Sequence, residues 1–130
     1  MYVLIDPSER ETFVFYFSVD LVTWTKKVVD SGACPHLLGA LIVALADEGV
    51  VLASLAGIAV RVGKGSFTRD RVAVTIVNML VFSLKIPAVT VDAVDFTSLN
   101  QRFQSLGEAR YIVATYSSPP NVGAKQPYLG

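Results

Sequence analysis

The stretch GIAVRVGKGSFTRDRVAVTIVNMLVFSLKIPAVTV, residues 57–91, decides the fold of this chain. Its pattern predicts a buried strand at Gly57–Val62, a glycine-rich turn, a helix at about Arg69–Leu84 and a second buried strand at Ala88–Val91. A helix between two such strands indicates a βαβ unit, because parallel strands need a crossover connection, which is almost always right-handed. We therefore expect an α/β domain built around this unit.

The turn GKGSFT, residues 63–68, shares glycines with two phosphate-binding motifs but matches neither. A Walker loop has four residues between its first glycine and its Gly-Lys pair, and Ser or Thr follows the lysine. Here five residues separate Gly57 from Gly63, and a glycine follows Lys64. The dinucleotide-binding fingerprint needs a glycine where this chain has Thr68. The sequence therefore argues against both motifs.

Two interpretations of this turn remain open. Free N–H groups at a helix start, beside the positive charge of Lys64, can hold an anion. Alternatively, Ser66 or Thr68 caps the helix, and the glycines only shape the turn.

The helix at about Arg69–Leu84 carries an unusually wide apolar arc. On a helical wheel only Thr75, Asn78 and Lys85 mark a polar strip, which Phe82 interrupts. The arc is about twice as wide as the stripe of about 100° typical of a surface helix. We therefore expect the sheet to cover one side of this helix, and another helix or another protein chain to cover the other. The arc consists of Val72, Ala73, Val74, Ile76, Val77, Met79, Leu80, Val81, Ser83 and Leu84.

The composition indicates one cytoplasmic domain. The 130 residues suffice for a single domain with a substantial core. Eleven basic and eleven acidic residues cancel without forming runs, so we expect no nucleic-acid-binding patch. The single cysteine, Cys34, favours a reducing compartment, and the N-terminus lacks a secretory signal pattern. A membrane span needs about 20 apolar residues, and Asp47 and Glu48 divide the apolar stretch at residues 37–60, so we expect no span.

Three strands and a helix are expected before the βαβ unit. The strands are predicted at Tyr2–Asp6, Thr12–Phe17 and Leu21–Val29, and their short connections favour an antiparallel meander. Lys26 and Lys27 suit an outer strand, where charges prevent unwanted pairing.

A helix is predicted at about Pro35–Glu48, since proline suits its first turn and Gly49 its end. Larger apolar residues form its expected core face, namely Leu37, Leu38, Leu41, Ile42 and Leu45. Small and apolar residues fill much of its outer side, namely Gly39, Ala40, Val43, Ala44 and Ala46. This helix and the later one thus carry more apolar surface than one sheet covers, which indicates an interaction site.

The pattern after the βαβ unit is weaker. We expect a helix at Phe96–Leu106, a last strand at Arg110–Thr115, and a tail rich in Pro, Gly and polar residues. Such a tail buries too little apolar surface to fold alone. The predicted organisation is a single domain at residues 1–115 and a flexible tail at residues 116–130.

The expected order β-β-β-α-β-α-β-α, around a mixed five-stranded sheet, is that of a ribonuclease-H-like domain, the building block of the actin, hexokinase and Hsp70 superfamily. GIAVRVGKGSFTRDRVAV followed by LKIPAVTV resembles the central signature of the TsaB family, which usually reads IAVGxGPGSFTGLRIG and then LGIPVVGVSSL. MYVLIDPSE resembles the family's opening, ILAIDTS. The resemblance spans about residues 1–96. The chain contains almost nothing that matches the family's second domain.

The resemblance implies a function. TsaB is a non-catalytic subunit of the bacterial machinery that makes N6-threonylcarbamoyladenosine (t6A) beside the anticodon of certain tRNAs. It pairs with its catalytic relative TsaD through two helices of its first domain, and the ATPase TsaE joins the assembly. For this chain the resemblance implies a scaffold without a cofactor, with a TsaD-like and a TsaE-like partner, which can form a homodimer when alone.

Two sets of site residues follow for this sequence. The signature loop comprises Gly63, Lys64, Gly65, Ser66, Phe67, Thr68 and Arg71. The partner-binding helices are expected to present Leu37, Leu38, Leu41, Leu45, Val74, Val77 and Val81. On this assignment, a charge at Val77 or Val81 abolishes pairing but leaves the monomer folded.

The chain also departs from the family pattern. The differences are Lys64 for the usual proline, Arg69 and Ala73 for glycines, Asp70 for a leucine and Met79 for a glycine. Packing at these glycine positions must therefore differ from the family pattern. The identity of the partner, or the register in which it binds, is expected to differ as well.

The sequence supplies no complete catalytic site. Asp6 stands at the strand end where the superfamily places a magnesium-site aspartate, but Pro7 and Ser8 do not form the usual glycine-bearing turn, so we interpret Asp6 as a turn residue. His36 has no metal-ligand partner at suitable spacing, so we interpret it as a surface residue at a helix start and expect no metal site. Cys34 suits packing better than nucleophilic chemistry.

Two alternatives to the scaffold remain open. One is a homodimeric domain that uses the same apolar surface without a role in tRNA modification. The other is a small nucleotide-binding protein that uses Lys64 and the signature loop.

Overall fold

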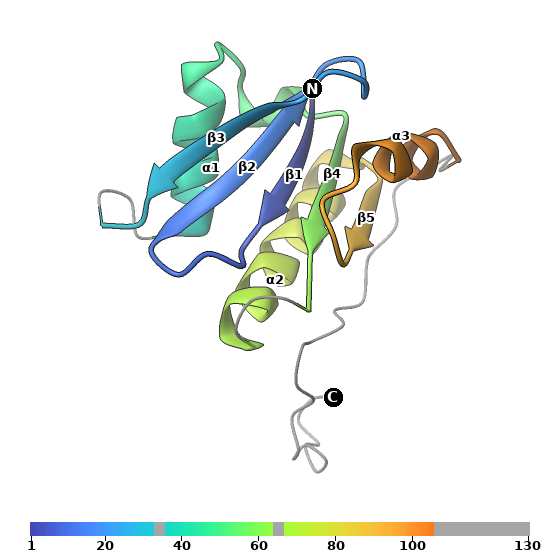
Figure 1. The fold of residues 1–130 in the computed structure, drawn as a ribbon. Helices are drawn as coiled ribbons and strands as arrows, with labels where there is room; N and C mark the ends of the chain where they lie inside the picture. Colours follow the sequence, from blue (N-terminus) through green and yellow to red (C-terminus); the bar gives the residue numbers. More distant parts are fainter. Residues whose placement is uncertain (33–35, 64–66, 106–130) are drawn as a thin grey trace.

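The computed structural model describes residues 1–32, 36–63 and 67–105 (Figure 1). In this part of the chain, five strands form one mixed sheet in the order β3-β2-β1-β4-β5, and three α-helices pack on it. In chain order the elements are β1 (Tyr2–Asp6), β2 (Thr12–Ser18), β3 (Thr25–Asp30), α1 (Leu37–Asp47), a 3-10 turn (Leu52–Ser54), β4 (Gly57–Arg61), α2 (Phe67–Leu84), β5 (Ala88–Val91) and α3 (Phe96–Ser105). The predicted α/β class with a mixed sheet is confirmed.

Strand β1 lies at the centre of the sheet and has neighbours of both orientations. β2 runs antiparallel to β1, with Tyr16 opposite Leu4, and β3 runs antiparallel to β2 at the sheet edge. β4 runs parallel to β1, with Ala59 opposite Leu4, and β5 runs parallel to β4. The predicted meander and βαβ unit are therefore both present. Lys26 and Lys27 lie on an edge strand, as expected.

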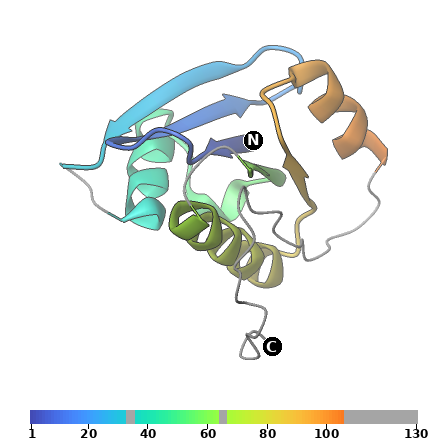
Figure 2. The same ribbon diagram turned by 60° about the horizontal axis from the view of Figure 1, so that its bottom comes forward.

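Helices cover both faces of the sheet (Figures 1 and 2). α1 and α2 lie side by side on one face, and α3 lies on the other. The main core under α1 and α2 includes Val3, Ile5, Phe15, Leu41, Ile58 and Val77. The smaller core under α3 includes Leu4, Ala59, Val89, Leu99 and Phe103. Neighbouring residues of one strand enter opposite cores because strand side chains alternate between faces, which explains the continuous apolar runs in the sequence.

Aromatic contacts hold α3 against the sheet. The rings of Trp24 and Phe96 stack with centroids 4.9 Å apart, and the rings of Tyr2 and Phe103 lie 5.0 Å apart. Gly57 lies against the second pair, and a Cβ at this position would be 2.8 Å from both rings. β4 must therefore begin with glycine if α3 is to pack this closely.

Helix α1 buries part of the predicted core face, namely Leu37, Leu41 and Leu45, but is rotated relative to the prediction. Its buried residues are Leu37, Ala40, Leu41, Ala44 and Leu45. Ile42, which was expected in the core, is exposed, whereas Ala40 and Ala44, which were expected on the outer side, are completely buried. Small alanine side chains let the helix approach the sheet closely, so the assignment by side-chain size was wrong at these three positions.

Strand β3 begins at Thr25 and not at Leu21 as predicted. The Asp20 carboxylate accepts hydrogen bonds from the backbone N–H groups of Val22 and Thr23, each at 2.9 Å, and this local bonding forms a loop in place of a strand. The bonds from Thr23 and Val22 lower the pKa of Asp20. Leu21 has a φ of 66° and nevertheless buries its side chain.

Some predictions concern residues outside the described ranges. They are Cys34, the helix start at Pro35, the loop residues Lys64, Gly65 and Ser66, the strand at Arg110–Thr115, and the tail at residues 116–130. Among the helices that the structure describes, none has the length and hydrophobicity needed to cross a lipid bilayer.

Candidate functional site

The outer side of α1 and α2 exposes large apolar residues that the sheet does not cover. On α1, Ile42 and Val43 are 46% and 47% exposed. On α2, Val72, Met79 and Phe82 are 46%, 44% and 68% exposed. We call these five residues the helical surface. Exposed apolar side chains grouped on two neighbouring helices are typical of an interaction site.

The residues predicted to contact a partner belong mostly to the core of the chain itself. Six of the seven are buried, namely Leu37, Leu41, Leu45, Val74, Val77 and Val81. Only Leu38 is partly exposed. An arc that is apolar on two sides does not reveal which half faces the sheet, so this assignment was wrong for the buried six. A charge at Val77 or Val81 is therefore expected to unfold the monomer.

A pocket of about 330 Å³ lies between the first turns of α1 and α2. Its walls are mainly apolar and include Phe13 from β2, Leu38 from α1, and Val72 and Ile76 from α2. Arg69 contributes a polar side. Because Val72 belongs to both the pocket and the helical surface, a partner that covers this surface also meets the pocket.

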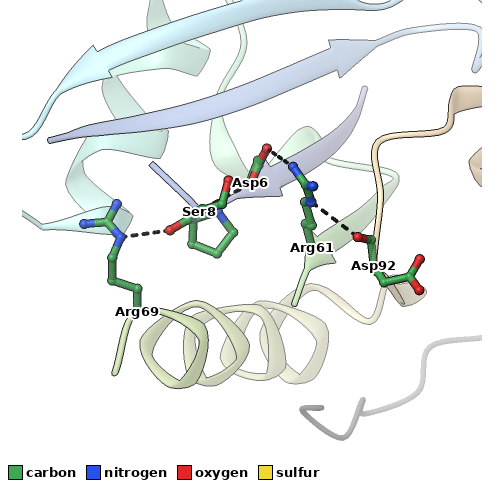
Figure 3. A network of polar contacts seen from close by, with 6 residues as sticks. Asp6, Ser8, Arg61, Arg69 and Asp92 are labelled. Atoms are coloured by element: carbon green, nitrogen blue, oxygen red, sulfur yellow. Dashed lines mark hydrogen bonds and ion pairs between the residues drawn. The ribbon is translucent and has the colours of Figure 1, made fainter. Parts of the chain in front are cut away.

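A second group of residues lies at the carboxyl ends of β1 and β4 (Figure 3). Asp6, the last residue of β1, is 5% exposed. Its Oδ1 accepts hydrogen bonds from the backbone N–H of Ser8 at 3.1 Å and from the Ser8 hydroxyl at 2.6 Å. The turn role predicted for Asp6 is confirmed.

The second carboxylate oxygen of Asp6 pairs with Arg61, the last residue of β4. Arg61 Nη1 lies 3.0 Å from Asp6 Oδ2, and Arg61 Nε donates to the backbone carbonyl of Asp92 at 3.4 Å (Figure 3). Both oxygens of the carboxylate are thus engaged within the chain. Arg61 was not among the predicted site residues, although a charge at the end of an apolar strand is a signal that an opposite charge lies nearby.

Arg69, near the start of α2, fastens the loop between β1 and β2. Its Nε, Nη1 and Nη2 donate to the backbone carbonyls of Pro7 at 2.8 Å, Arg10 at 3.2 Å and Thr12 at 3.0 Å. Its guanidinium also lies 5.1 Å from the centroid of the Phe13 ring, a distance suited to a cation–π contact. The departure from glycine at this position therefore has a structural role, which no local pattern in the sequence predicted.

The structure describes only part of the signature loop. Gly63 has a φ of 90°, a conformation that favours glycine. Thr68 and Arg71 are exposed on the first turns of α2, and residues 64–66 lie outside the described ranges. The conformation of the central loop residues 64–66 therefore stays a prediction.

Asp70, completely buried in α2, ties the helix to this loop. Its Oδ2 accepts the backbone N–H of Gly63 at 2.8 Å. Its Oδ1 has no hydrogen-bond partner in the part of the chain that the structure describes. A carboxylate here occupies an N–H group on which an anion site would depend, and its charge repels anions. The contact between Asp70 and Gly63 therefore weighs against an anion at the Gly63 N–H group.

His36 occupies the N-cap position of α1 and is exposed, as predicted for a surface residue at a helix start. Within the described ranges, no three His, Cys, Asp or Glu side chains are grouped so that they could hold a metal ion. The buried Asp6 carboxylate has a guanidinium as its opposite charge.

Comparison with known proteins identifies structural neighbours. No family model matches the sequence, and no curated protein matches it. Two similar solved structures are YeaZ from Pseudomonas aeruginosa and an uncharacterized protein with similarity to peptidase YeaZ from Pseudomonas aeruginosa. Each is 26% identical with a TM-score of 0.57, and each comparison covers 69% of this chain and 42% of the other chain.

This chain thus spans less than half the length of these neighbours. YeaZ is another name for TsaB and has a ribonuclease-H-like fold. The structural likeness therefore agrees with the resemblance carried by the sequence.

Proposed function

We propose that this chain is a ribonuclease-H-like scaffold subunit, without catalytic activity of its own, in the synthesis of t6A on tRNA. It binds a TsaD-like catalytic subunit through the helical surface and supports it, and a TsaE-like ATPase joins the assembly. The likeness to YeaZ supports this proposal. The observation that carries it is the apolar helical surface, which the sheet of the chain leaves exposed.

The helical surface supplies only part of the binding free energy that such a role needs. Fully burying one side chain of this kind stabilises by about 1.5–3 kcal/mol, so five side chains that are roughly half exposed contribute on the order of 5 kcal/mol. Association costs about 4 kcal/mol or more. The helical surface alone is therefore marginal, and the partner must add contacts of its own. The pocket beside Val72 is available for them.

The contacts of Asp6 at the carboxyl end of β1, and of Asp70 in α2, support a role without catalysis. Both carboxylate oxygens of Asp6 are engaged, one by Ser8 and the other by Arg61. The buried charge of Asp70 opposes the binding of phosphate beside the signature loop. These contacts weigh against the nucleotide-binding alternative. Calorimetry with ATP and magnesium tests it, and micromolar binding would restore it.

Co-expression with the TsaD-like protein of the same genome tests the scaffold. The wild-type chain is expected to co-purify with that protein, and Met79→Glu to lose it, because a charge in an interface that excludes water is costly. Gln101→Glu adds the same charge to an exposed position on α3, on the other face of the sheet, and is expected to keep the complex. Equal loss in both variants, or no binding by the wild-type chain, would contradict the proposal.

A homodimer is the alternative that the same helical surface favours. Both assemblies need Met79, so the substitution does not separate them, but competition does. The scaffold predicts that the TsaD-like protein displaces the second copy. A homodimer that this protein cannot displace would support the alternative.

A further inference from the structure

Strand β5 (Ala88–Val91) is an edge of the sheet without a protecting charge. Among the strands that the structure describes, it pairs only with β4. Its sequence AVTV contains no charged residue, whereas the opposite edge strand, β3, carries Lys26 and Lys27. Edge strands of natural proteins are usually protected by charges or covered by another segment. The edge at β5 therefore favours a covering segment.

Two helices end beside β5, one on each face of the sheet. α2 ends shortly before β5 begins, with residues 85–87 between them. On the opposite face, Arg102 near the end of α3 donates a hydrogen bond to the Thr90 carbonyl of β5. The chain therefore leaves α3 beside β5 (Figure 1), across the sheet edge from the last turns of α2. These turns carry Met79 and Phe82, which are 44% and 68% exposed.

The chain that follows α3 has the length and the composition to reach these turns. After Ser105 it continues with residues 106–130, which lie outside the described ranges, and their most apolar run is YIVATY, residues 111–116. Packed layers lie about 10 Å apart, so the path from α3 around the sheet edge to α2 is roughly 20 Å long. Six residues span up to about 20 Å. The run thus begins at the point where the chain can first reach α2.

A covering segment of the same chain needs less contact than a separate molecule. The last turns of α2 offer mainly Met79 and Phe82, which is little for a separate molecule, because association costs translational and rotational freedom. A segment joined by a short connection has already lost most of this freedom, and its effective concentration is on the order of millimolar. Residues 111–116 are therefore the occupant that this surface favours.

We propose that residues 111–116 pass along the β5 edge and cover Met79 and Phe82 on α2. Both residues belong to the helical surface, so a partner reaches the whole of this surface only after it displaces the segment. The segment thus acts as an internal competitor that lowers the affinity for the partner. The covering of α2 depends on this chain alone, whereas the displacement rests on the proposed function.

The methyl signals of methionine in the NMR spectrum test the covering in the full chain. The sequence contains only Met1 and Met79, so ¹³C-methyl labelling of methionine gives one reporter on α2 and one reference at the start of β1. A spin label is attached at Ser117→Cys, directly after the segment, and Cys34→Ser removes the native thiol. We expect the spin label to remove the Met79 signal and to weaken the Met1 signal less.

Two controls assign this loss to the segment. Ile112→Asp together with Val113→Asp should restore the Met79 signal in the spin-labelled chain, because charges in the run oppose its burial. A mixture of spin-labelled chain without ¹³C and ¹³C-labelled chain without the spin label should keep the Met79 signal. A Met79 signal that the spin label does not weaken, or that the two substitutions do not restore, would overturn the inference. Loss of the signal in the mixture would also overturn it, because a second copy would then cover α2.

Binding to the TsaD-like protein tests the displacement separately. Ile112→Asp with Val113→Asp should lower the Kd on the order of tenfold, because more of the chain then presents the helical surface. Ser117→Asp with Ser118→Asp adds the same charge beside the segment and should keep the wild-type Kd. An unchanged Kd in the first variant, or an equal gain in the second, would overturn the displacement. If none of the chains binds, the proposed function fails and the displacement with it, while the Met79 signals still decide whether the segment covers α2.

Discussion

Two substitutions on α2 separate the core from the helical surface. Val77 is completely buried, whereas Met79, only two residues later, is 44% exposed. Val77→Glu loses a buried side chain, at about 1.5–3 kcal/mol, and buries a carboxylate without a positive partner, at roughly 3–5 kcal/mol. The sum is comparable with the total stability of about 5–15 kcal/mol that is typical of a domain. We therefore expect Val77→Glu to be largely unfolded.

Met79→Glu should remain folded, because surface substitutions usually change the free energy of unfolding by about 0.5 kcal/mol or less. Urea unfolding measures both variants. Trp24 is the single tryptophan and stacks on Phe96, so its fluorescence reports whether α3 remains packed on the sheet. Circular dichroism follows the helices in the same samples.

The two variants should therefore differ in outcome. If Val77→Glu unfolds at the wild-type urea concentration, Val77 does not lie in the core and the orientation of α2 is wrong. If Met79→Glu is as unstable as Val77→Glu, Met79 is not part of an accessible surface, and the helical surface as defined here does not exist.

Three further predictions concern loops and strand ends. Arg69→Ala should lower the free energy of unfolding by about 2 kcal/mol, because three partly exposed hydrogen bonds to loop carbonyls are lost. Arg69→Lys should recover only part of this loss. An unchanged urea midpoint would show that the loop does not need the guanidinium. Gly57→Ala should cost about 1–3 kcal/mol, because its Cβ overlaps two aromatic rings, and a wild-type Tm would contradict the close packing of α3. Bonds from the backbone N–H groups of Thr23 and Val22 lower the pKa of Asp20 from 3.8, so the ionised group stabilises the fold above this value and loses its contribution as the pH falls through the lowered pKa. The stability difference between the wild-type chain and Asp20→Ala should therefore be constant near neutral pH and shrink in acid below pH 3.8, and a difference that persists in acid would contradict this cause.

Most elements of the fold could be predicted because each depends on a local pattern. The apolar runs of β1, β4 and β5 indicate strands buried on both faces, and the apolar pattern after residue 68 indicates α2. The start of β3 could not be predicted in the same way. Leu21 and Val22 have the composition of a strand, but the Asp20 side chain binds the local backbone and forms a loop instead.

The helical surface could be predicted only in outline. The excess of apolar residues on α1 and α2 is visible in the sequence, but the rotation of each helix against the sheet is not. Ala40 and Ala44 are buried because α1 approaches the sheet closely, and this rotation exposes Ile42. A prediction from side-chain size alone therefore placed Ile42 in the core and the two alanines on the surface, the reverse of what the structure shows.

The partners of Arg61 and Arg69 could not be predicted from the sequence for a different reason. Arg61 and Asp6 are separated by 55 positions in the sequence, and Arg69 and Pro7 by 62. These contacts form only when β1 and β4 pair and α2 returns beside the β1–β2 loop. Tertiary structure, and no local pattern, brings these residues together.

The proposed function depends on the helical surface binding another protein chain. Size-exclusion chromatography with light scattering, on the chain mixed with the TsaD-like protein of the same genome, tests it most directly. We expect a complex with the summed mass of both proteins, which Met79→Glu abolishes and Gln101→Glu preserves. A chain that stays monomeric at high concentration, and elutes unchanged beside the TsaD-like protein, would contradict it.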